Sequence, residues 1–328
     1  MGYSSEVIRR ARQRLESAKA DRESENRQNE ALAYAQVPRL REIDRELRMT
    51  MAQAISSVFA SGGDVQEAMK AAREKNLNLQ LERRELIAAN FPEGFLDDAP
   101  ICDKCGGSGY IGTQMCECLA ELCRQEQKKE LTFLMGQEKF EQFRLDYYPD
   151  RIDPKLGVNI RQVMEKTLNT CRRYAINFTE KSPNLLFSGD TGLGKTFLSA
   201  CIARTVADSG YSVVYESANH LFSNMESARF NDDADARRDC KKYTACDLLI
   251  VDDLGTEMAG QFVTASLYAL VNDRILAGKP TIISTNLNSD EIARRYNPQI
   301  ASRLRGSYKR VAFVGDDIRL LKNRGVIQ

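Results

Sequence analysis

The sequence has no long hydrophobic run and almost no net charge. DLLIVDD at residues 247–253 is a buried-type stretch, but it is far too short to span a bilayer. The N-terminal segment MGYSSEVIRRARQRLESAKADRE is charged and lacks the apolar centre of a secretion signal. A net charge of +1 over 328 residues excludes a strong overall attraction to nucleic acid or membrane, so any basic surface must be local. We therefore expect a cytoplasmic protein.

Histidine is also scarce, because His220 is the only one, whereas there are nine cysteines. Disulfides are rare in a reducing cytosol, and five of the cysteines lie within residues 102–123, which favours a metal site. His220 is remote in sequence, so the ligands of such a site are expected to be all sulfur. The scattered cysteines are predicted to be core residues: Cys171, Cys201, Cys240 and Cys246.

Two close pairs of cysteines flank a glycine-rich loop in CDKCGGSGYIGTQMCEC. Cys102 and Cys105 form C-x-x-C, and Cys116 and Cys118 form C-x-C. Four thiolates in this spacing can bind a tetrahedral Zn²⁺ and leave no open position for water, so we predict a structural zinc. Cys123 is a possible replacement ligand. The alternatives to zinc are free structural cysteines or a redox pair.

Residues 1–90 have the periodicity and the charge of helices. Apolar residues recur at three- or four-residue steps on one helical face: Val37, Leu40, Ile43, Leu47, Met51, Ile55 and Val58. Pro38 fits the first turn of this helix. SGGD at residues 61–64 breaks it, and Asp64 could cap a second helix that ends near Asn90. The pair is predicted to be a helical hairpin or short coiled coil, whose apolar face either binds a partner or serves only its own domain.

From about residue 158 apolar strands alternate with helical patterns. The strands are predicted at residues 185–188, 211–215, 247–251, 281–285 and 309–314. This alternation predicts an α/β fold with a parallel sheet and helices on both faces. We expect four regions, namely a helical partner-binding region (1–97), a zinc module with a connecting helix near 117–136 (98–136), a linker that holds FEQFRLDYYPD (137–157) and the α/β domain (158–328).

GDTGLGKT at residues 189–196 matches G-x-x-x-x-G-K-[ST] and lies between the strand NLLFS and the helix FLSACIARTVA. Glycines allow backbone N–H groups to turn inward around phosphate oxygens, and the following helix presents its N-terminus to the anion. Lys195 can reach the β- and γ-phosphates, and Thr196 can ligate Mg²⁺. The predicted ATP-binding set is Gly189, Asp190, Thr191, Gly192, Leu193, Gly194, Lys195, Thr196 and Phe197. A chance glycine turn is the alternative.

The segment DLLIVDDLGTE predicts the acidic half of the same site, because a buried strand ends there in two carboxylates. Asp252 is expected to hold Mg²⁺, directly or through water. Asp253 is expected to polarise the attacking water. Aspartate is shorter than the glutamate that many proteins with this motif have at the same position. Glu257 could therefore share the task of polarising the water. A structural loop carboxylate is the alternative for Asp253.

Further polar residues are predicted to complete the catalytic set. KPTIISTNL is another buried strand with a polar end, where Asn286, or else Thr285, would orient the attacking water; a strand-end cap is the alternative. Arg303, near the end of a short helix, could neutralise transition-state charge in a neighbouring subunit. A surface salt bridge is its alternative. Arg319, in the final helix, is a weaker candidate to sense nucleotide in its own subunit.

The motifs FEQFRLDYYPD, GDTGLGKT, LLIVDDLG, TIISTN and ASRL together resemble those of AAA+ ATPases of the DnaC/DnaI helicase-loader group, over about residues 140–328. The same ATPase module serves IstB-type transposition helpers. NFPEGFLDDAPICDKCGGSGYIGTQMCECL resembles the cysteine module before the ATPase in Gram-positive-type loaders. The usual C-terminal lid of AAA+ proteins looks short or absent.

The resemblance implies a weak, assembly-dependent ATPase of the primosome. Such a protein binds the replicative hexameric helicase through its N-terminal region and delivers it to single-stranded DNA during replication initiation or restart. The sequence leaves open two other readings, a transposition helper with the same ATPase and a zinc-containing adaptor that binds ATP as a switch. A phage or mobile-element copy of a loader is a further possibility. The size of the assembly, and whether ATP drives binding or release, are also open.

Local basic segments are candidates for contact with DNA. ARRDCKKY, ARRYNP and RLRGSYKR combine positive charge with tyrosine, and an aromatic ring can stack on a base. The candidate residues are Lys241, Lys242, Arg305, Lys309 and Arg310. A solvated helix face is the alternative for each.

Overall fold

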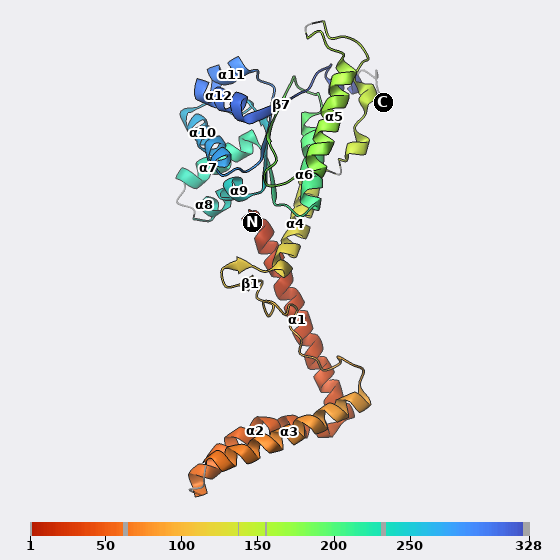
Figure 1. Ribbon diagram of the computed structural model, residues 1–328, viewed down its shortest axis with the longest axis vertical. Coiled ribbons are helices and arrows are strands. Elements are labelled where there is room, and N and C mark those ends of the chain that lie inside the picture. The colour runs from red at the N-terminus through yellow and green to blue at the C-terminus, as the bar shows by residue number, and fades with distance from the viewer. Residues whose placement is uncertain (1, 62–64, 137, 155, 231–233, 324–328) are drawn as a thin grey trace. The chain divides into compact units, whose positions relative to one another are not determined.

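The computed structural model describes residues 2–61, 65–136, 138–154, 156–230 and 234–323 (Figure 1). The chain divides into two compact units. The α/β unit comprises Met1–Arg12 and Leu119–Gln328, and the helical unit comprises Gln13–Cys118. Within the described residues, no helix is long and apolar enough to cross a membrane.

A five-stranded parallel sheet forms the centre of the α/β unit, with the strand order β4-β5-β6-β3-β7. The strands are β3 (Asn184–Ser188), β4 (Val213–Ser217), β5 (Leu248–Leu254), β6 (Thr281–Thr285) and β7 (Tyr308–Ala312). All five predicted strands are present, although several of their ends are shifted by a few residues. The predicted α/β fold with a parallel sheet is therefore confirmed.

Helices cover both faces of this sheet (Figure 1). One face carries α5 (Ile160–Ile176) and α6 (Lys195–Asp208), and the other carries α7 (Ala218–Phe230), α10 (Gln261–Leu276), α11 (Ser289–Arg295) and α12 (Pro298–Ser307). The remaining helices of the unit are α8 (Ala234–Cys240) and α9 (Lys242–Ala245) before β5, α13 (Ile318–Asn323) after β7, and most of α4 (Glu117–Met135). β5 and β6 are both buried, and β5 begins with the continuous apolar run Leu248–Val251 that is typical of a strand covered on both faces.

The segment expected to be a linker packs into the core of the α/β unit, beside α5 and the phosphate loop. It forms two short 3₁₀ turns, η1 (Phe140–Gln142) and η2 (Leu145–Tyr147), and the side chains of Phe140 and Tyr148 are buried. The Tyr148 hydroxyl donates a hydrogen bond to the carbonyl of Leu193 over 2.9 Å. The phosphate loop therefore rests on this segment.

The start of α1 (Ser5–Gln36) also belongs to the α/β unit. Val7 and Ala11 are buried, and the backbone N–H and the hydroxyl of Ser5 both donate to Asp239 over 3.1 and 2.7 Å. Of the scattered cysteines, Cys171, Cys201 and Cys246 are buried as predicted, and Cys240 is half-buried.

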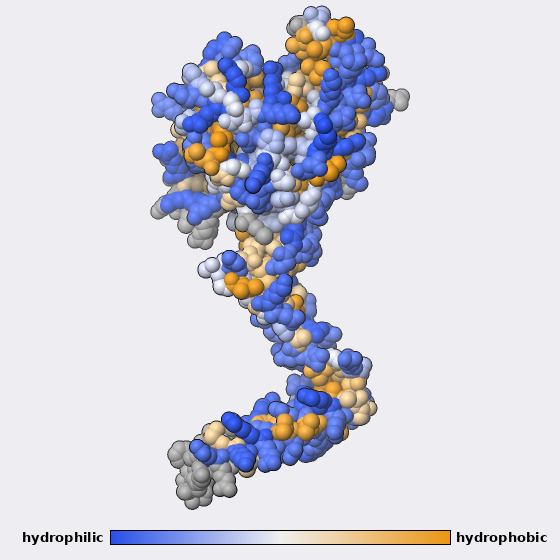
Figure 2. All heavy atoms as spheres, viewed as in Figure 1, coloured by the Kyte–Doolittle hydropathy of each residue, from blue (hydrophilic) through white to orange (hydrophobic). Residues whose placement is uncertain are grey.

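The helical unit contains the predicted hairpin, α2 (Pro38–Ser61) and α3 (Val65–Asn90). Leu40, Ile43 and Leu79 are buried, and two ion pairs of 2.8 Å cross the hairpin, Arg39 to Glu82 and Arg83 to Asp44. The visible face of the hairpin mixes hydrophilic with hydrophobic side chains (Figure 2). The predicted break at residues 62–64 with Asp64, and the side chains of Met51, Ile55 and Val58, lie outside the described residues.

Candidate nucleotide and zinc sites

The phosphate loop joins β3 to α6 across residues 189–194. Gly194, the residue before the helix, has a φ of 86°, a left-handed conformation that only glycine adopts without strain. Gly192 also has a positive φ, 71°, and a Cβ atom there would lie 1.9 Å from Oδ1 of Asp317, so a side chain would displace that carboxylate. The loop therefore needs glycine at both positions, and it presents its N–H groups at the N-terminus of α6, a natural site for an anion.

Lys195 is the first residue of α6 and is 5% exposed. Its ammonium group donates to the carbonyls of Gly189 over 2.8 Å and Asp190 over 2.7 Å. Burial lowers the pKa of Lys195, and the carboxylates of Asp253 and Asp252 act in the opposite direction. The ammonium group of Lys195 therefore lies close enough to the carboxylates at the end of β5 to interact with them electrostatically.

The next two residues of the predicted set have different surroundings. Thr196 is exposed in the first turn of α6, where its side chain is accessible to a ligand. Phe197 is half-buried, with its ring centroid 5.8 Å from that of Phe143. The predicted residues from Gly189 to Phe197 form one continuous strand–loop–helix element.

Asp252 lies near the end of β5 and is 5% exposed. Both of its carboxylate oxygens accept hydrogen bonds from neighbouring strands: Oδ2 from the hydroxyl of Tyr215 over 2.6 Å, and Oδ1 from the hydroxyl of Ser284. These two contacts fix the rotation of the carboxylate. Carboxylate oxygens are preferred ligands of Mg²⁺, so the orientation of this group matters for a metal.

Asp253 has an unusual backbone. Its φ of 55° makes it the only non-glycine residue with a positive φ in the described chain, and it falls where the β5–β6 register shifts. Its N–H donates to the Ser284 hydroxyl over 2.9 Å. The carboxylate remains accessible, and partial desolvation together with the charge of Asp252 raises the pKa of Asp253. This irregularity at the strand end turns the carboxylate out of the sheet.

Sequence reasoning missed Ser284 and Tyr215, which contact Asp252 directly. Thr285, the second choice at this strand end, is fully buried, and its hydroxyl donates to the carbonyl of Leu254 over 2.6 Å. Asn286, the first choice, follows the strand and is exposed. The missing information was the register of β5 against β6, because residues one apart on a strand point to opposite faces.

Glu257, proposed from the sequence to share the task of Asp253, is 3% exposed. Its Oε2 accepts the N–H of Gly255 over 2.9 Å, and its Oε1 accepts the hydroxyl of Tyr296. Both oxygens of this carboxylate are therefore engaged in contacts within the loop and with α11.

The two candidate arginines occupy separate places. Arg303 on α12 donates to the hydroxyl of Tyr268 over 3.1 Å, and its guanidinium lies 5.1 Å from the centre of that ring. Arg319 is exposed on α13, and its charge influences the pKa values of Lys195 and Asp253. The structure thus places Arg319 near the phosphate loop of its own chain, and Arg303 on a different element.

The basic candidates for DNA contact differ in accessibility. Lys242 is engaged within the protein, since its ammonium pairs with Asp239 over 2.9 Å and with Glu216 over 3.4 Å. Arg310 donates to the hydroxyl of Ser188 over 2.7 Å. Arg310 is nevertheless exposed, as are Lys241, Arg305 and Lys309.

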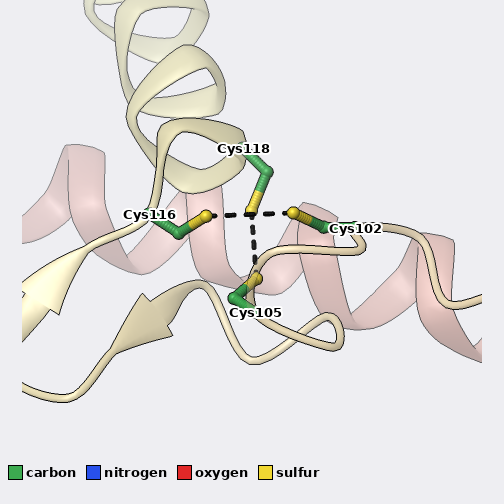
Figure 3. Close-up of side chains that lie close together, drawn as sticks. All are labelled: Cys102, Cys105, Cys116 and Cys118. Atoms are coloured by element: carbon green, nitrogen blue, oxygen red, sulfur yellow. Dashed lines mark hydrogen bonds between the residues drawn. The ribbon is translucent and has the colours of Figure 1, made fainter.

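The four cysteines of the two predicted pairs converge in the helical unit (Figure 3). All four sulfur atoms lie within 4.8 Å of one another, with 3.8 Å between Cys102 and Cys116 and 3.4 Å between Cys105 and Cys118. A tetrahedral zinc with bonds of about 2.3 Å to sulfur would separate its ligands by about 3.8 Å. The sulfur positions therefore fit a Zn²⁺ ion.

A short hairpin of β1 (Tyr110–Ile111) and β2 (Gln114–Met115) separates the two pairs of cysteines. Desolvation opposes ionisation of Cys105, but hydrogen bonds from the N–H of Gly109 and from neighbouring thiols outweigh it and lower the pKa of Cys105 to about 6. Cys123, the possible replacement ligand, is buried on α4 and lies outside this group of four.

A central parallel sheet, a G-x-x-x-x-G-K-T loop between β3 and α6, and an acidic end on β5, which β6 separates from β3, define an AAA+ P-loop fold. Residues 151–301 match the family described as IstB-like ATP binding protein.

Individual relatives match part of this chain. The replicative helicase loader DnaC of Escherichia coli K12 is 26% identical over 153 residues, which is 46% of this chain and 62% of that protein. An ATP-binding protein of insertion sequence IS232 from Bacillus thuringiensis subsp. berliner is 28% identical over 133 residues, 40% of this chain and 51% of that protein. A crystal structure of the DnaC helicase loader is 20% identical and covers 52% of this chain and 99% of that one, with a TM-score of 0.43.

The matches to DnaC and to the IstB-like family confirm the predicted resemblance for the α/β unit. The chain spans less than two thirds of the length of the DnaC relatives that it matches, 62% for the Escherichia coli protein.

Proposed function

We propose that this protein is an ATP-dependent loader of a replicative DNA helicase, active in the cytoplasm. The observation that supports this function best is the single site formed by the phosphate loop, Lys195 and the carboxylates of Asp252 and Asp253. The match to relatives named replicative helicase loader DnaC supports a replicative helicase as the partner.

In this proposal ATP lies with its phosphates against residues 189–196. Lys195 would leave the carbonyls of the loop to bind the β- and γ-phosphates, and Thr196 and Asp252 would hold Mg²⁺, which neutralises charge on the phosphates. Asp253, on its outward turn, would accept a proton from the attacking water, with Asn286 orienting that water. Arg303 of a neighbouring subunit would stabilise the transition state, so turnover would be weak until subunits assemble. Arg319 would contact the nucleotide of its own subunit.

The four-cysteine group would hold a structural Zn²⁺. Cys102, Cys105, Cys116 and Cys118 occupy all four positions of a tetrahedral ion, so the metal would tie the hairpin together and leave no position for a substrate. The α2–α3 hairpin of the same unit is the proposed contact with the helicase. Exposed Lys241, Arg305, Lys309 and Arg310 are the proposed contacts with single-stranded DNA.

Co-purification with hexameric helicases, with and without ATP, tests this function. We expect the wild-type protein to retain a helicase and to hydrolyse ATP faster when helicase and single-stranded DNA are present. Lys195→Ala should weaken ATP binding roughly a hundredfold, the loss of about two charge-assisted hydrogen bonds. Lys166→Ala, which removes an exposed lysine of α5 to which the proposal gives no role, is the control. Unchanged ATP affinity in Lys195→Ala would show that the phosphate-loop assignment is wrong.

A transposition helper is the second candidate, since the matched family and the IS232 protein carry the same ATPase module. The two functions differ in partner rather than in chemistry. Retention of a transposase instead of a helicase in the same assay would favour the helper. Retention of a helicase with ATP bound but not hydrolysed would indicate an adaptor that uses ATP as a switch.

A further inference from the structure

Glu257 is a buried carboxylate that joins two elements of the α/β unit. It lies in the loop after β5, where it accepts hydrogen bonds from the N–H of Gly255 and the hydroxyl of Tyr296. The guanidinium of Arg295 lies alongside, with Nε 3.5 Å from Oε1 of Glu257, and also donates to the backbone carbonyl of Glu257. A buried carboxylate is costly unless it is paired and hydrogen-bonded, so these contacts hold the loop and the end of α11 together.

One side of this network supports the turn of Asp253. Both the N–H and the hydroxyl of Thr256 donate to the carbonyl of Asp253, over 3.3 and 2.8 Å. Gly255, which Glu257 binds, has a φ of 111°, and a Cβ atom there would lie 2.7 Å from Leu287. Glu257 therefore stabilises the left-handed turn that presents the Asp253 carboxylate, through its hydrogen bond with the N–H of Gly255.

The other side of the network leads to Arg303. Tyr296 ends α11 and directly precedes Asn297, whose side chain caps α12 by accepting the N–H of Ile300 over 2.7 Å. Helix α12 carries Arg303. A shift of Tyr296 would thus move the start of the helix from which Arg303 projects.

We infer that Glu257 is a positioning residue that couples the Asp253 turn in one subunit to the helix that presents Arg303 to the next. This inference rests on the proposed ATPase function and adds a route between neighbouring sites. When the Asp253 turn changes with the state of its own nucleotide, Glu257 transmits the change through Tyr296 and Arg295 to α12.

Tyr296→Phe is the sharpest variant, because it removes only the hydroxyl that donates to Glu257 and keeps the ring. We expect turnover with helicase and DNA to fall about tenfold while ATP affinity stays as in wild type. The melting temperature should fall by a few degrees, because the buried carboxylate loses one hydrogen bond. Glu257→Gln should behave similarly. Tyr174→Phe is the matched control: it removes another buried hydroxyl, which has no hydrogen-bond partner in the described part of the chain.

Mixed assemblies test the action on the neighbour. A Lys195→Ala subunit cannot use its own site but still offers Arg303 to a wild-type partner. Adding Tyr296→Phe to that subunit should lower the turnover of its wild-type partners at least threefold further, which a purely structural role within one site would not do.

Wild-type turnover by Tyr296→Phe and Glu257→Gln, alone and in mixtures, would overturn the coupling and leave the ATPase function intact. The coupling would also be wrong if both variants lost ATP affinity in proportion to turnover. Intact nucleotide binding by Lys195→Ala, or no turnover by the wild-type protein with its partners, would instead contradict the ATPase function and the coupling with it.

Discussion

At the scale of single residues, the acidic strand end depends on two hydroxyl groups. Tyr215 and Ser284 hold the two oxygens of Asp252, and Ser284 also accepts the N–H of Asp253. One serine therefore contacts both the carboxylate of Asp252 and the backbone of Asp253. Groups that hold a metal ligand in place from outside the coordination sphere have a large effect on metal affinity and activity.

Tyr215→Phe should lower ATP turnover roughly tenfold and raise the Mg²⁺ concentration needed for half-maximal turnover, because Asp252 loses one of the hydrogen bonds that orient it. Nucleotide binding without metal should not change. A titration of turnover against Mg²⁺ measures this effect, with Tyr174→Phe as the control. An unaltered Mg²⁺ dependence would mean that Tyr215 has no part in metal binding.

The residues of the phosphate loop and Asp252 could be predicted because each is part of a local motif with a fixed spacing. Ser284 could not, since its contact with Asp252 crosses 32 positions of sequence and depends on how β6 is aligned with β5. The same alignment turns Thr285 to a backbone carbonyl of β5. Sequence reasoning identified the correct strand end but could not determine which polar side chain faces the carboxylate.

At the scale of elements, the carboxylate of Asp247 links the residues that directly precede β4 and β5. Asp247 accepts the N–H and the hydroxyl of Ser212 over 2.9 and 2.7 Å, and it pairs with Lys279 over 3.1 Å. Burial of Asp247 opposes ionisation, but these hydrogen bonds outweigh it and hold the pKa of Asp247 below its ordinary value. Folding therefore favours the charged form.

Asp247→Asn should lower the free energy of unfolding by about 1–3 kcal/mol at pH 7, the cost of disturbing a buried hydrogen-bonded group. Because the pKa is lowered on folding, this contribution is complete above the unfolded-state value of about 3.9 and is lost as the pH falls through the folded value. Urea denaturation at several pH values should show a difference that is constant from about pH 7 to 5 and narrows below about pH 4. Asp208→Asn, at an exposed ion pair, should change stability much less. An equally large effect at low pH would refute this account of Asp247.

The β1–β2 hairpin with its four cysteines, residues 102–118, is too small to bury a hydrophobic core. We predict that a bound zinc ion stabilises it instead. Purified protein should contain about one zinc per chain by elemental analysis, the content of a single four-thiolate site. Cys105→Ser should lose the metal, and chelation should make residues 102–118 sensitive to protease, because metal binding and folding are coupled in such modules. Cys123→Ser is the control and should keep its zinc; if it loses the metal and Cys118→Ser does not, Cys123 is the ligand.

At the scale of the whole molecule, two units serve different proposed tasks. The helical unit carries the cysteine site and the α2–α3 hairpin, and the α/β unit carries the nucleotide site. Arg39 pairs with Glu82 across the hairpin and also lies near Glu42 and Glu46. Replacing Arg39 with glutamate would place four carboxylates close together in the hairpin and would not change the α/β unit.

Arg39→Glu should therefore weaken helicase binding and leave ATP affinity unchanged. Charge repulsion should disturb the hairpin only modestly, since solvent screens these partly exposed side chains. The double variant with Glu82→Arg restores one opposite-charge pair and should recover part of the binding. Co-purification and nucleotide titration of the same samples separate the two effects. A parallel loss of ATP affinity would argue against independent tasks.

The sequence by itself determined the phosphate loop, the acidic end of β5, the four-cysteine group and the order of helices and strands. These features follow from local spacing and from the periodicity of apolar residues, which a linear sequence records completely. Tertiary structure alone decided that Ser284 and Tyr215 orient Asp252, that Lys242 is engaged by acidic partners, and that Glu257 joins the Asp253 turn to α11. The physical reason is that each of these contacts depends on strand register and helix packing, which bring together side chains far apart in the chain.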